Sequence, residues 1–213
     1  MVRAYLIRHG ESTANRDGVY AGDTDVPLTE TGRRQALALA RRFASVPLDV
    51  IVTSPLQRAV HTAEAIAAGR GLEVVVDPRW RELDLGLWEG RTYEAVARED
   101  PAAFARWLEG GSEAAAPGGE SWAAMLERVG TAWEHWRRQI GTGAIAFVTH
   151  TGPIRAMVAH ALAIDRLRAR RLKVDPASIT ALDWGREGPR IVTLNDTAHV
   201  TGCGLWPAPE DAR

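Results

Sequence analysis

Short apolar runs alternate with longer amphipathic stretches along most of this 213-residue chain. Short runs of this kind are typical of strands, and stretches with a period near 3.6 residues are typical of helices. Strands are expected over residues 3–7, 49–53, 74–76 and 144–148, and a hairpin over 179–184 and 190–194. Residues 144–148 are apolar at every position, as expected for a central buried strand.

Amphipathic stretches and their boundary residues predict the helices. They are expected over 29–44, from Pro55 onward, over 92–108 with a break near Asp100, over 121–140, and from 151 to about 162. Thr29 suits an N-cap, and Pro55 suits a first helical position because its missing N–H costs nothing there. The apolar face of the first helix is expected to contain Ala36, Leu37, Ala40, Phe43 and Ala44.

This alternation predicts an α/β fold, in which a mainly parallel central sheet is flanked by helices in a three-layer sandwich. The chain length fits one domain over residues 1–213. Residues 109–119 are rich in Gly, Ala and Pro and are expected to form a flexible loop. Together with the helices around it, this loop is expected to form a lid-like insertion over about 92–122.

Composition and charge exclude several classes of protein. The hydrophobic fraction of 46%, the charged fraction of 25% and the net charge of -1 are ordinary for a globular protein, and the chain has no long basic run for nucleic acid. No apolar run is long enough for a membrane span or a signal peptide, so a cytoplasmic protein without a membrane partner is expected. Cys203 is the only cysteine, so no internal disulfide and no zinc site with Cys/His spacing is expected.

Candidate catalytic groups follow three of the expected strands. The first strand is followed by Arg8 and His9, the helix after the second carries Arg58 in its first turn, and the strand over 144–148 is followed closely by His150. In open α/β sheets, ligands bind outside the carboxyl ends of the strands, where helix N-termini attract anions. Two arginines and two histidines at that edge predict a site for a dianion such as phosphate.

The motifs around these residues resemble those of the histidine phosphatase superfamily, also called the phosphoglycerate mutase-like family. The resemblance covers most of the chain, because each motif falls at its expected place. The matching segments are Leu6-Ile7-Arg8-His9-Gly10-Glu11-Ser12 with Asn15, Gly22, Asp25-Val26-Pro27-Leu28-Thr29 with Gly32, Thr53-Ser54-Pro55-Leu56-Gln57-Arg58-Ala59, Thr62-Ala63, Glu82 with Gly86, Trp88-Glu89-Gly90, Gly119-Glu120-Ser121, and Val148-Thr149-His150-Thr151-Gly152.

The resemblance implies a role for each candidate side chain. His9 would attack phosphorus and hold the phosphoryl group, and Glu82 would protonate the leaving group and then activate water. Arg8, Arg58 and His150 would bind the phosphoryl oxygens, and Asn15 would donate to the same group. The substrate site would also include Ala21, Gly22, Thr151 and Gly152. The arginines and His150 would supply the positive charge, so neither a metal nor a cofactor is expected.

For several residues, the sequence allows two interpretations of their role or location. Glu89 and Asp84 are alternatives to Glu82 as the acid, although the segment that begins at Trp80 matches the family's spacing best. Trp107 and Trp122 are expected in the core, with a hydrophobic lid over the site as the alternative. The arginine-rich residues 166–173 are expected to form a solvated helix face.

The segment after Glu82 favours the phosphatase branch of the family. It contains Trp88-Glu89-Gly90 and no Asn-Lys pair of the kind found in family mutases. Hydrolysis of a small-molecule phosphate ester is therefore expected, with phosphoglycerate mutase as the alternative and a turnover-free binding protein as a third hypothesis. The segments at Tyr20 and Pro27 are similar to α-ribazole phosphatases and broad-specificity phosphatases, although Ala21 replaces a Gln found in some of them. A homo-oligomer is compatible with the sequence, and no motif decides the oligomeric state.

Overall fold

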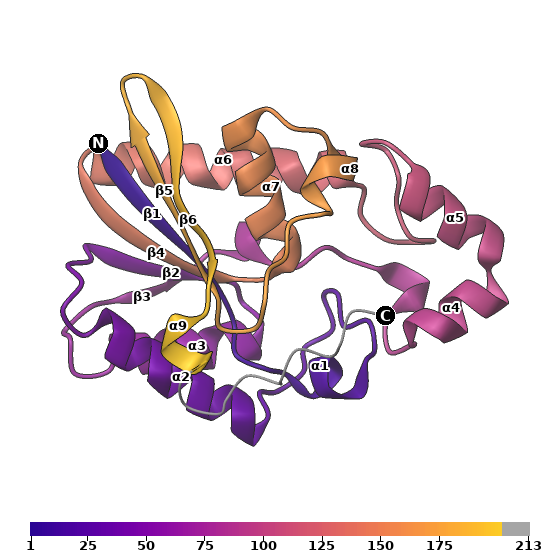
Figure 1. Cartoon of the computed structure of the whole chain (residues 1–213), viewed down its shortest axis with the longest axis horizontal. Helices are drawn as coiled ribbons and strands as arrows, with labels where there is room; N and C mark the ends of the chain where they lie inside the picture. Colours follow the sequence, from indigo (N-terminus) through magenta and orange to yellow (C-terminus); the bar gives the residue numbers. More distant parts are fainter. Residues whose placement is uncertain (202–213) are drawn as a thin grey trace.

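A six-stranded mixed sheet forms the middle layer of the structure (Figure 1). The computed structural model describes residues 1–201, and Cys203 lies outside them. The strands are β1 (Val2–Arg8), β2 (Val50–Thr53), β3 (Val74–Val76), β4 (Gly143–Thr149), β5 (Ile179–Gly185) and β6 (Gly188–Asp196). Their order is β3-β2-β4-β1-β5-β6, and the first four are parallel to one another whereas β5 and β6 are antiparallel. The expected α/β fold with a mainly parallel sheet is confirmed.

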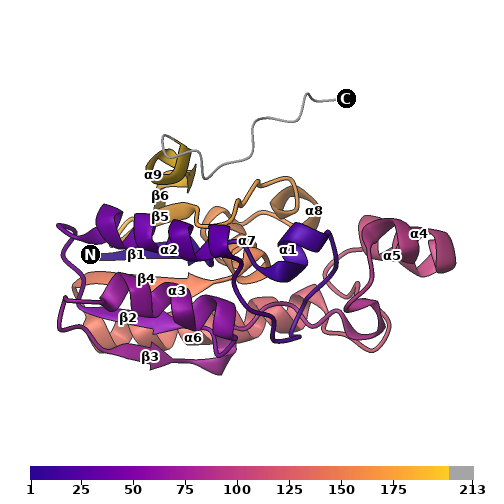
Figure 2. The same ribbon diagram turned by 90° about the horizontal axis from the view of Figure 1, so that it is seen from below.

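Helices cover both faces of this sheet, which completes three layers. On one face lie α2 (Glu30–Phe43) and α3 (Gln57–Ala67), which Figure 2 shows in front of the strands. On the other face lie α6 (Trp122–Ile140) and α7 (Thr151–Leu162). Successive side chains of β4 point alternately into the two apolar cores, one on each face of the sheet. Ile145 and Phe147 pack with α6 and α7, whereas Ala146 and Val148 pack with α2 and α3.

The buried face of α2 differs from the expected one. Thr29 caps the helix as expected, by accepting a hydrogen bond from the N–H of Gly32. Leu37, however, is 54% exposed, and Ala44 is exposed as well. Gln35 is buried in their place, because its Oε1 accepts the N–H of Glu11 at 2.7 Å. The apolar periodicity alone could not reveal that a polar side chain belongs to the buried stripe.

The helix after β2 begins two residues later than expected, at Gln57 rather than at Pro55. Leu56 is its N-cap, with an extended ψ of 132°. The Oγ of Ser54 accepts the N–H of Leu56 at 3.3 Å and lies 2.7 Å from Nε2 of His150. These two contacts place the buried Ser54 side chain between the start of α3 and the residue that follows β4.

Two short helices, α4 (Tyr93–Glu99) and α5 (Pro101–Glu109), extend away from the sheet at one end of the molecule (Figure 1). The expected break falls between them at Asp100, whose side chain accepts the N–H of Ala103 at 3.0 Å. Residues of this region share a small apolar cluster with Tyr20 and Trp88. Residues 110–121 form no helix or strand. That residues 92–122 act as a lid stays a prediction.

The remaining helices are short, and only the one within residues 166–173 was expected. They are α1 (Thr13–Asp17), α8 (Arg166–Ala169), α9 (Ala198–Thr201) and the 3₁₀ helices η1 (Pro78–Trp80) and η2 (Gly86–Trp88). Over residues 1–201, no helix has both the length and the apolar character needed to cross a membrane.

The register of the parallel strands gathers three of their ends at one edge of the sheet. Arg8 pairs with Thr149 across β1 and β4, and Thr53 pairs with Val148 across β2 and β4. The residues that follow the three strands, which are His9, Ser54 and His150, therefore start from neighbouring positions.

Candidate active site

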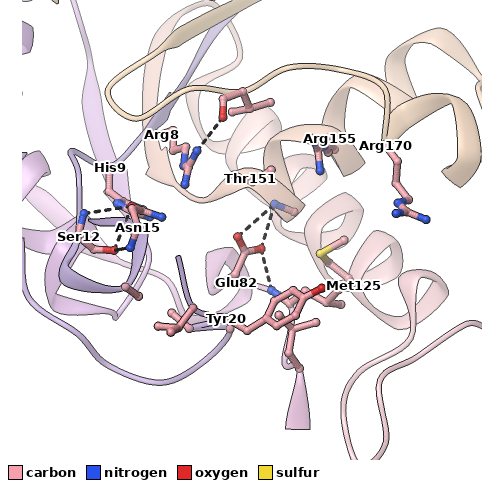
Figure 3. Close-up of a pocket in the computed structure, with 18 of the residues that line it drawn as sticks. Arg8, His9, Ser12, Asn15, Tyr20, Glu82, Met125, Thr151, Arg155 and Arg170 are labelled. Carbon is pink, nitrogen blue, oxygen red and sulfur yellow. Dashed lines mark hydrogen bonds between the residues drawn. The ribbon is translucent and has the colours of Figure 1, made fainter. Parts of the chain in front are cut away.

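A pocket of about 380 Å³ lies at this edge of the sheet (Figure 3). Four of the five proposed catalytic residues line it, and so do the other residues proposed to bind the substrate. These lining residues are Arg8, His9, Arg58, Glu82, Asn15, Ala21, Gly22, Thr151 and Gly152. His150 is the exception, because it is completely buried behind the lining.

The His9 ring is held in one tautomer. Its Nδ1 lies 2.6 Å from the carbonyl oxygen of Gly10, which can only accept a hydrogen bond. Nδ1 therefore carries the proton, and Nε2 keeps its lone pair. Burial, reinforced by Arg58 and Arg8, lowers the pKa of His9 well below 6.5. The ring is therefore neutral at pH 7, which is the form that a nucleophile requires.

His150 lies beside His9, with 5.0 Å between the two ring centroids. Its Nε2 is 2.7 Å from the Oγ of Ser54, and its Nδ1 has no hydrogen-bond partner among residues 1–201. Burial is the largest of the causes that lower the pKa of His150 well below 6.5. If the Ser54 hydroxyl donates to Nε2, the neutral ring carries its proton on Nδ1 as an unused donor. Sequence reasoning had missed this contribution of Ser54.

Arg8 and Arg58 are both buried and are both held by backbone carbonyl groups. Arg8 donates to the carbonyl of Val174 at 2.8 Å, and its buried Nε has no partner in the described part of the chain. Arg58 donates to the carbonyls of Thr24 and Gly22 at 2.8 and 2.7 Å. Burial lowers the pKa of Arg8 to about 10, so the group stays charged at pH 7. The carbonyl groups orient the two guanidinium groups without neutralising them.

The Glu82 side chain faces the pocket (Figure 3), whereas Glu89 and Asp84, the two alternatives for the acid, do not line it. Its Oε1 accepts the N–H groups of Gly152 at 2.9 Å and of Leu83 at 2.8 Å. The carboxylate of Glu89 instead accepts backbone N–H groups of the surrounding loops, and Asp84 accepts one from η2. The geometry therefore favours Glu82 over Glu89 and Asp84 as the acid in reach of a ligand.

Asn15 is oriented by a capping box at the start of α1. Its Oδ1 accepts both the N–H and the Oγ–H of Ser12, each at 3.0 Å. The amide nitrogen of Asn15 is therefore left as the donor for other groups. The spacing from Ser12 to Asn15 is the sequence signal that could have revealed this short helix.

Two glycines of the site have little room for a side chain. Gly22 has a φ of +50°, and a Cβ there would overlap the Glu89 carboxylate. A Cβ on Gly152 would overlap the Glu82 carboxylate and lie 2.9 Å from Sδ of Met125. The N–H of Gly152 is engaged with Glu82, so its expected contact with phosphate stays a prediction.

One wall of the pocket consists of residues that sequence reasoning did not assign to the site. Arg155 of α7, together with Arg166 and Arg170, forms this wall beside Trp107. The expectation of a solvated face over residues 166–173 is wrong for Arg166, which is 5% exposed and donates to the carbonyls of Trp107 and Gly110. It is also wrong for Arg170, which lies 4.8 Å over the Trp107 ring.

Trp107 and Trp122 both line the pocket, although Trp122 is also part of the core. Contact of either ring with a substrate stays a prediction. Among residues 1–201, no group of three His, Cys, Asp or Glu side chains is arranged to hold a metal ion.

The arrangement has a definite chemical capacity. A neutral imidazole with a free Nε2 lies among charged guanidinium groups, an amide donor and a carboxylic side chain. Such a site binds a dianion, places a nucleophile next to it and offers a group for proton transfer.

Comparisons with known proteins agree with this chemistry. A family model described as histidine phosphatase superfamily (branch 1) matches residues 4–197. Phosphoserine phosphatase 1 of Hydrogenobacter thermophilus is 36% identical over 200 residues, which cover 94% of this chain and 95% of that protein. The probable phosphoglycerate mutase GpmB of Cronobacter sakazakii is 33% identical over 210 residues, covering 96% and 98%. The crystal structure of the alpha-ribazole phosphatase from Shigella flexneri superposes with a TM-score of 0.83 at 30% identity, covering 91% of this chain and 96% of that one.

Proposed function

Because the chain belongs to the histidine phosphatase superfamily, we propose that it hydrolyses small phosphorylated metabolites through a phosphohistidine formed on His9. The chain is a phosphomonoesterase, as relatives named for phosphoserine phosphatase and alpha-ribazole phosphatase support. The observation that carries the phosphohistidine proposal is the His9 ring, whose protonated Nδ1 is fixed by Gly10 while Nε2 stays free.

The reaction has two displacements at phosphorus. In the first, Nε2 of His9 forms a bond to phosphorus while the bond to the ester oxygen breaks, and Glu82 gives its proton to the departing alkoxide. In the second, water attacks phosphorus, its proton passes to the Glu82 carboxylate, and the bond to His9 breaks. Alcohol and inorganic phosphate are released, and His9 and Glu82 return to their starting forms.

The buried cations stabilise the charge that moves to the phosphoryl oxygens in both steps. Arg8 and Arg58 are already oriented by carbonyl groups, so little reorganisation is needed when the substrate binds. Asn15 adds a neutral donor. The buried Nδ1 of His150 gains an acceptor when the phosphoryl group is attached to the neighbouring His9 ring.

Hydrolysis of p-nitrophenyl phosphate and of an alkyl phosphate in the presence of EDTA tests this proposal. Both activities should persist in EDTA, because arginines rather than a metal supply the positive charge, and both should be lost in His9→Ala. His61→Ala is a matched control, since His61 is exposed on α3 and outside the pocket. Unchanged turnover in His9→Ala would contradict the assignment of the nucleophile, and loss of activity in EDTA would contradict metal independence.

Phosphoglycerate mutase activity is the second candidate, because relatives such as GpmB of Cronobacter sakazakii carry that name. It requires that the phosphoryl group return from His9 to a substrate hydroxyl rather than to water. Interconversion of 2- and 3-phosphoglycerate in the presence of a bisphosphate primer would establish it. Release of inorganic phosphate without isomerisation would remove it.

Two further expectations stay predictions. A cytoplasmic location is tested by cell fractionation, and a homo-oligomer is tested by light scattering of the purified chain.

A further inference from the structure

The pocket carries more positive charge than one phosphate group requires. Among residues 1–201, its lining contains five arginines and a single carboxylate, that of Glu82. Arg8 and Arg58 lie at the end proposed for the phosphoryl group. The other three arginines, Arg155, Arg166 and Arg170, form the wall described above. Among the ion pairs of residues 1–201, none involves any of the five.

Arg155 and Arg170 are oriented by neutral groups. Arg155 donates from Nε and one terminal nitrogen to the carbonyl oxygen of Leu172, at 3.0 and 2.8 Å. Arg170 donates to the carbonyl oxygen of Leu108 and lies over the Trp107 ring. Backbone carbonyl groups and an aromatic face hold a guanidinium group in place while leaving its full charge available to an anion.

These positive charges also repel one another. Burial is the main cause that lowers the pKa of Arg155 and of Arg166, and the charge of Arg170 adds to it, although the Glu82 carboxylate acts in the opposite direction on Arg155. For Arg166 the pKa falls to about 10, so the group is still charged at pH 7. An anion placed among like charges that are kept close together relieves this repulsion.

Two of these three arginines, Arg155 and Arg170, lie apart from the proposed phosphoryl position. Figure 3 shows Arg155 and Arg170 on the side of the pocket away from His9, beyond Glu82. Tyr20 lines the same pocket and contacts the Trp107 ring edge-on, with 6.1 Å between centroids. A pocket of about 380 Å³ is within the usual range for small-molecule sites and has room for a substrate body between the two ends.

We propose that Arg155 and Arg170 bind a second anionic group, a carboxylate or a phosphate, on the same phosphate monoester whose phosphoryl group is transferred to His9. This inference rests on the proposed phosphatase function and adds the substrate class. Arg166 is a positioning residue here, because its guanidinium group donates to the carbonyls of Trp107 and Gly110 at 2.6 and 2.7 Å and so fixes the wall behind Arg170.

Matched pairs of esters test the second anion site. 3-Phosphoglycerate and glycerol 3-phosphate differ by a carboxylate in place of a hydroxymethyl group. Fructose 1,6-bisphosphate and fructose 6-phosphate differ by a second phosphate. At least one of the two pairs should show kcat/KM higher by tenfold or more for the ester with the second anion, and the preferred pair identifies the anion. Ratios below twofold in both pairs would overturn the proposal.

Substitutions at the wall assign this preference to residues. For the ester pair with the larger preference, Arg170→Gln should lower the ratio of the two kcat/KM values by at least tenfold. Arg170→Lys, which keeps the charge, should retain most of that ratio. Arg171→Gln is the matched control, because Arg171 is the exposed neighbour outside the pocket. An unchanged ratio in Arg170→Gln, with an unchanged thermal unfolding midpoint, would overturn the proposal. If the native chain did not hydrolyse even p-nitrophenyl phosphate, the proposed function itself would be contradicted, and the second anion site with it.

Discussion

Gly152→Ala tests the role of Glu82 without changing a titratable group. A Cβ at this position would overlap the Glu82 carboxylate and lie 2.9 Å from Sδ of Met125. Both obstructing atoms are at the ends of flexible side chains, so the backbone of α7 can stay in place while the carboxylate is displaced. Glu82 then loses the hydrogen bond that it accepts from the N–H of Gly152 at 2.9 Å.

The size of the effect follows from that hydrogen bond. A bond to a charged group contributes about 1.5–3 kcal/mol, and each 1.36 kcal/mol changes a rate about tenfold. If Glu82 acts as the acid, kcat/KM for an alkyl phosphate should fall by roughly 10- to 150-fold. For p-nitrophenyl phosphate, whose leaving group needs little protonation, the fall should stay below about threefold.

Steady-state hydrolysis of the two substrates by native and variant chains measures this difference. Gly130→Ala is the control, because Gly130 is inside α6 with open space around its Cβ direction. It should leave both rates unchanged and raise the free energy of unfolding by up to about 1 kcal/mol. Equal losses on both substrates in Gly152→Ala, or no loss on either, would refute the assignment of Glu82 as the acid.

Three further substitutions test the nucleophile and the buried groups around it. Ser54→Ala removes the contact with Nε2 of the buried His150 and should lower kcat/KM about tenfold and the free energy of unfolding by about 1–3 kcal/mol, measured by activity and denaturant titration. Arg58→Lys keeps the charge but cannot donate to the carbonyls of Gly22 and Thr24 at the same time as a planar guanidinium group does, so kcat/KM should fall at least about tenfold in the same assay. A native-like kcat/KM would contradict the need for the guanidinium geometry. Burial lowers the pKa of His9 well below 6.5, so the unfolded chain binds a proton that the folded chain does not, and stability falls as the pH drops below about 6.5. His9→Asn should therefore lose about 1.3 kcal/mol less than the native chain between pH 7 and pH 5.5, and identical pH dependences would contradict a neutral buried ring.

The positions at the carboxyl edge of the sheet could be predicted because parallel strands end together. Once residues 3–7 and 144–148 are taken as parallel strands, His9 and His150 are expected at the same edge of the sheet, and the pairing of β1 with β4 makes them neighbours. Glu82 depended on the family's spacing, since Glu89 and Asp84 offered the same chemistry nearby. The structure separates them by which carboxylate faces the pocket.

The pocket wall formed by Arg155, Arg166 and Arg170 could not be predicted, because its residues meet the rest of the pocket only through long-range contacts. Arg166 contacts carbonyl groups of residues 107 and 110, more than fifty positions earlier in the chain. In the sequence it belongs to an arginine-rich stretch, which is typical of a solvated helix face. The buried face of α2 was missed for a related reason, since the bond from the N–H of Glu11 to Gln35 is not visible in a hydrophobic period.

The most direct test of the account is to trap the phosphoryl group on His9. Native chain mixed rapidly with a labelled phosphate ester and quenched in alkali should carry about one phosphoryl group per chain, stable in base and released in acid. Mass spectrometry should place it on His9, and His9→Asn should carry none. Turnover by the native chain with no trapped phosphoryl group, or label on another residue, would contradict the phosphohistidine route.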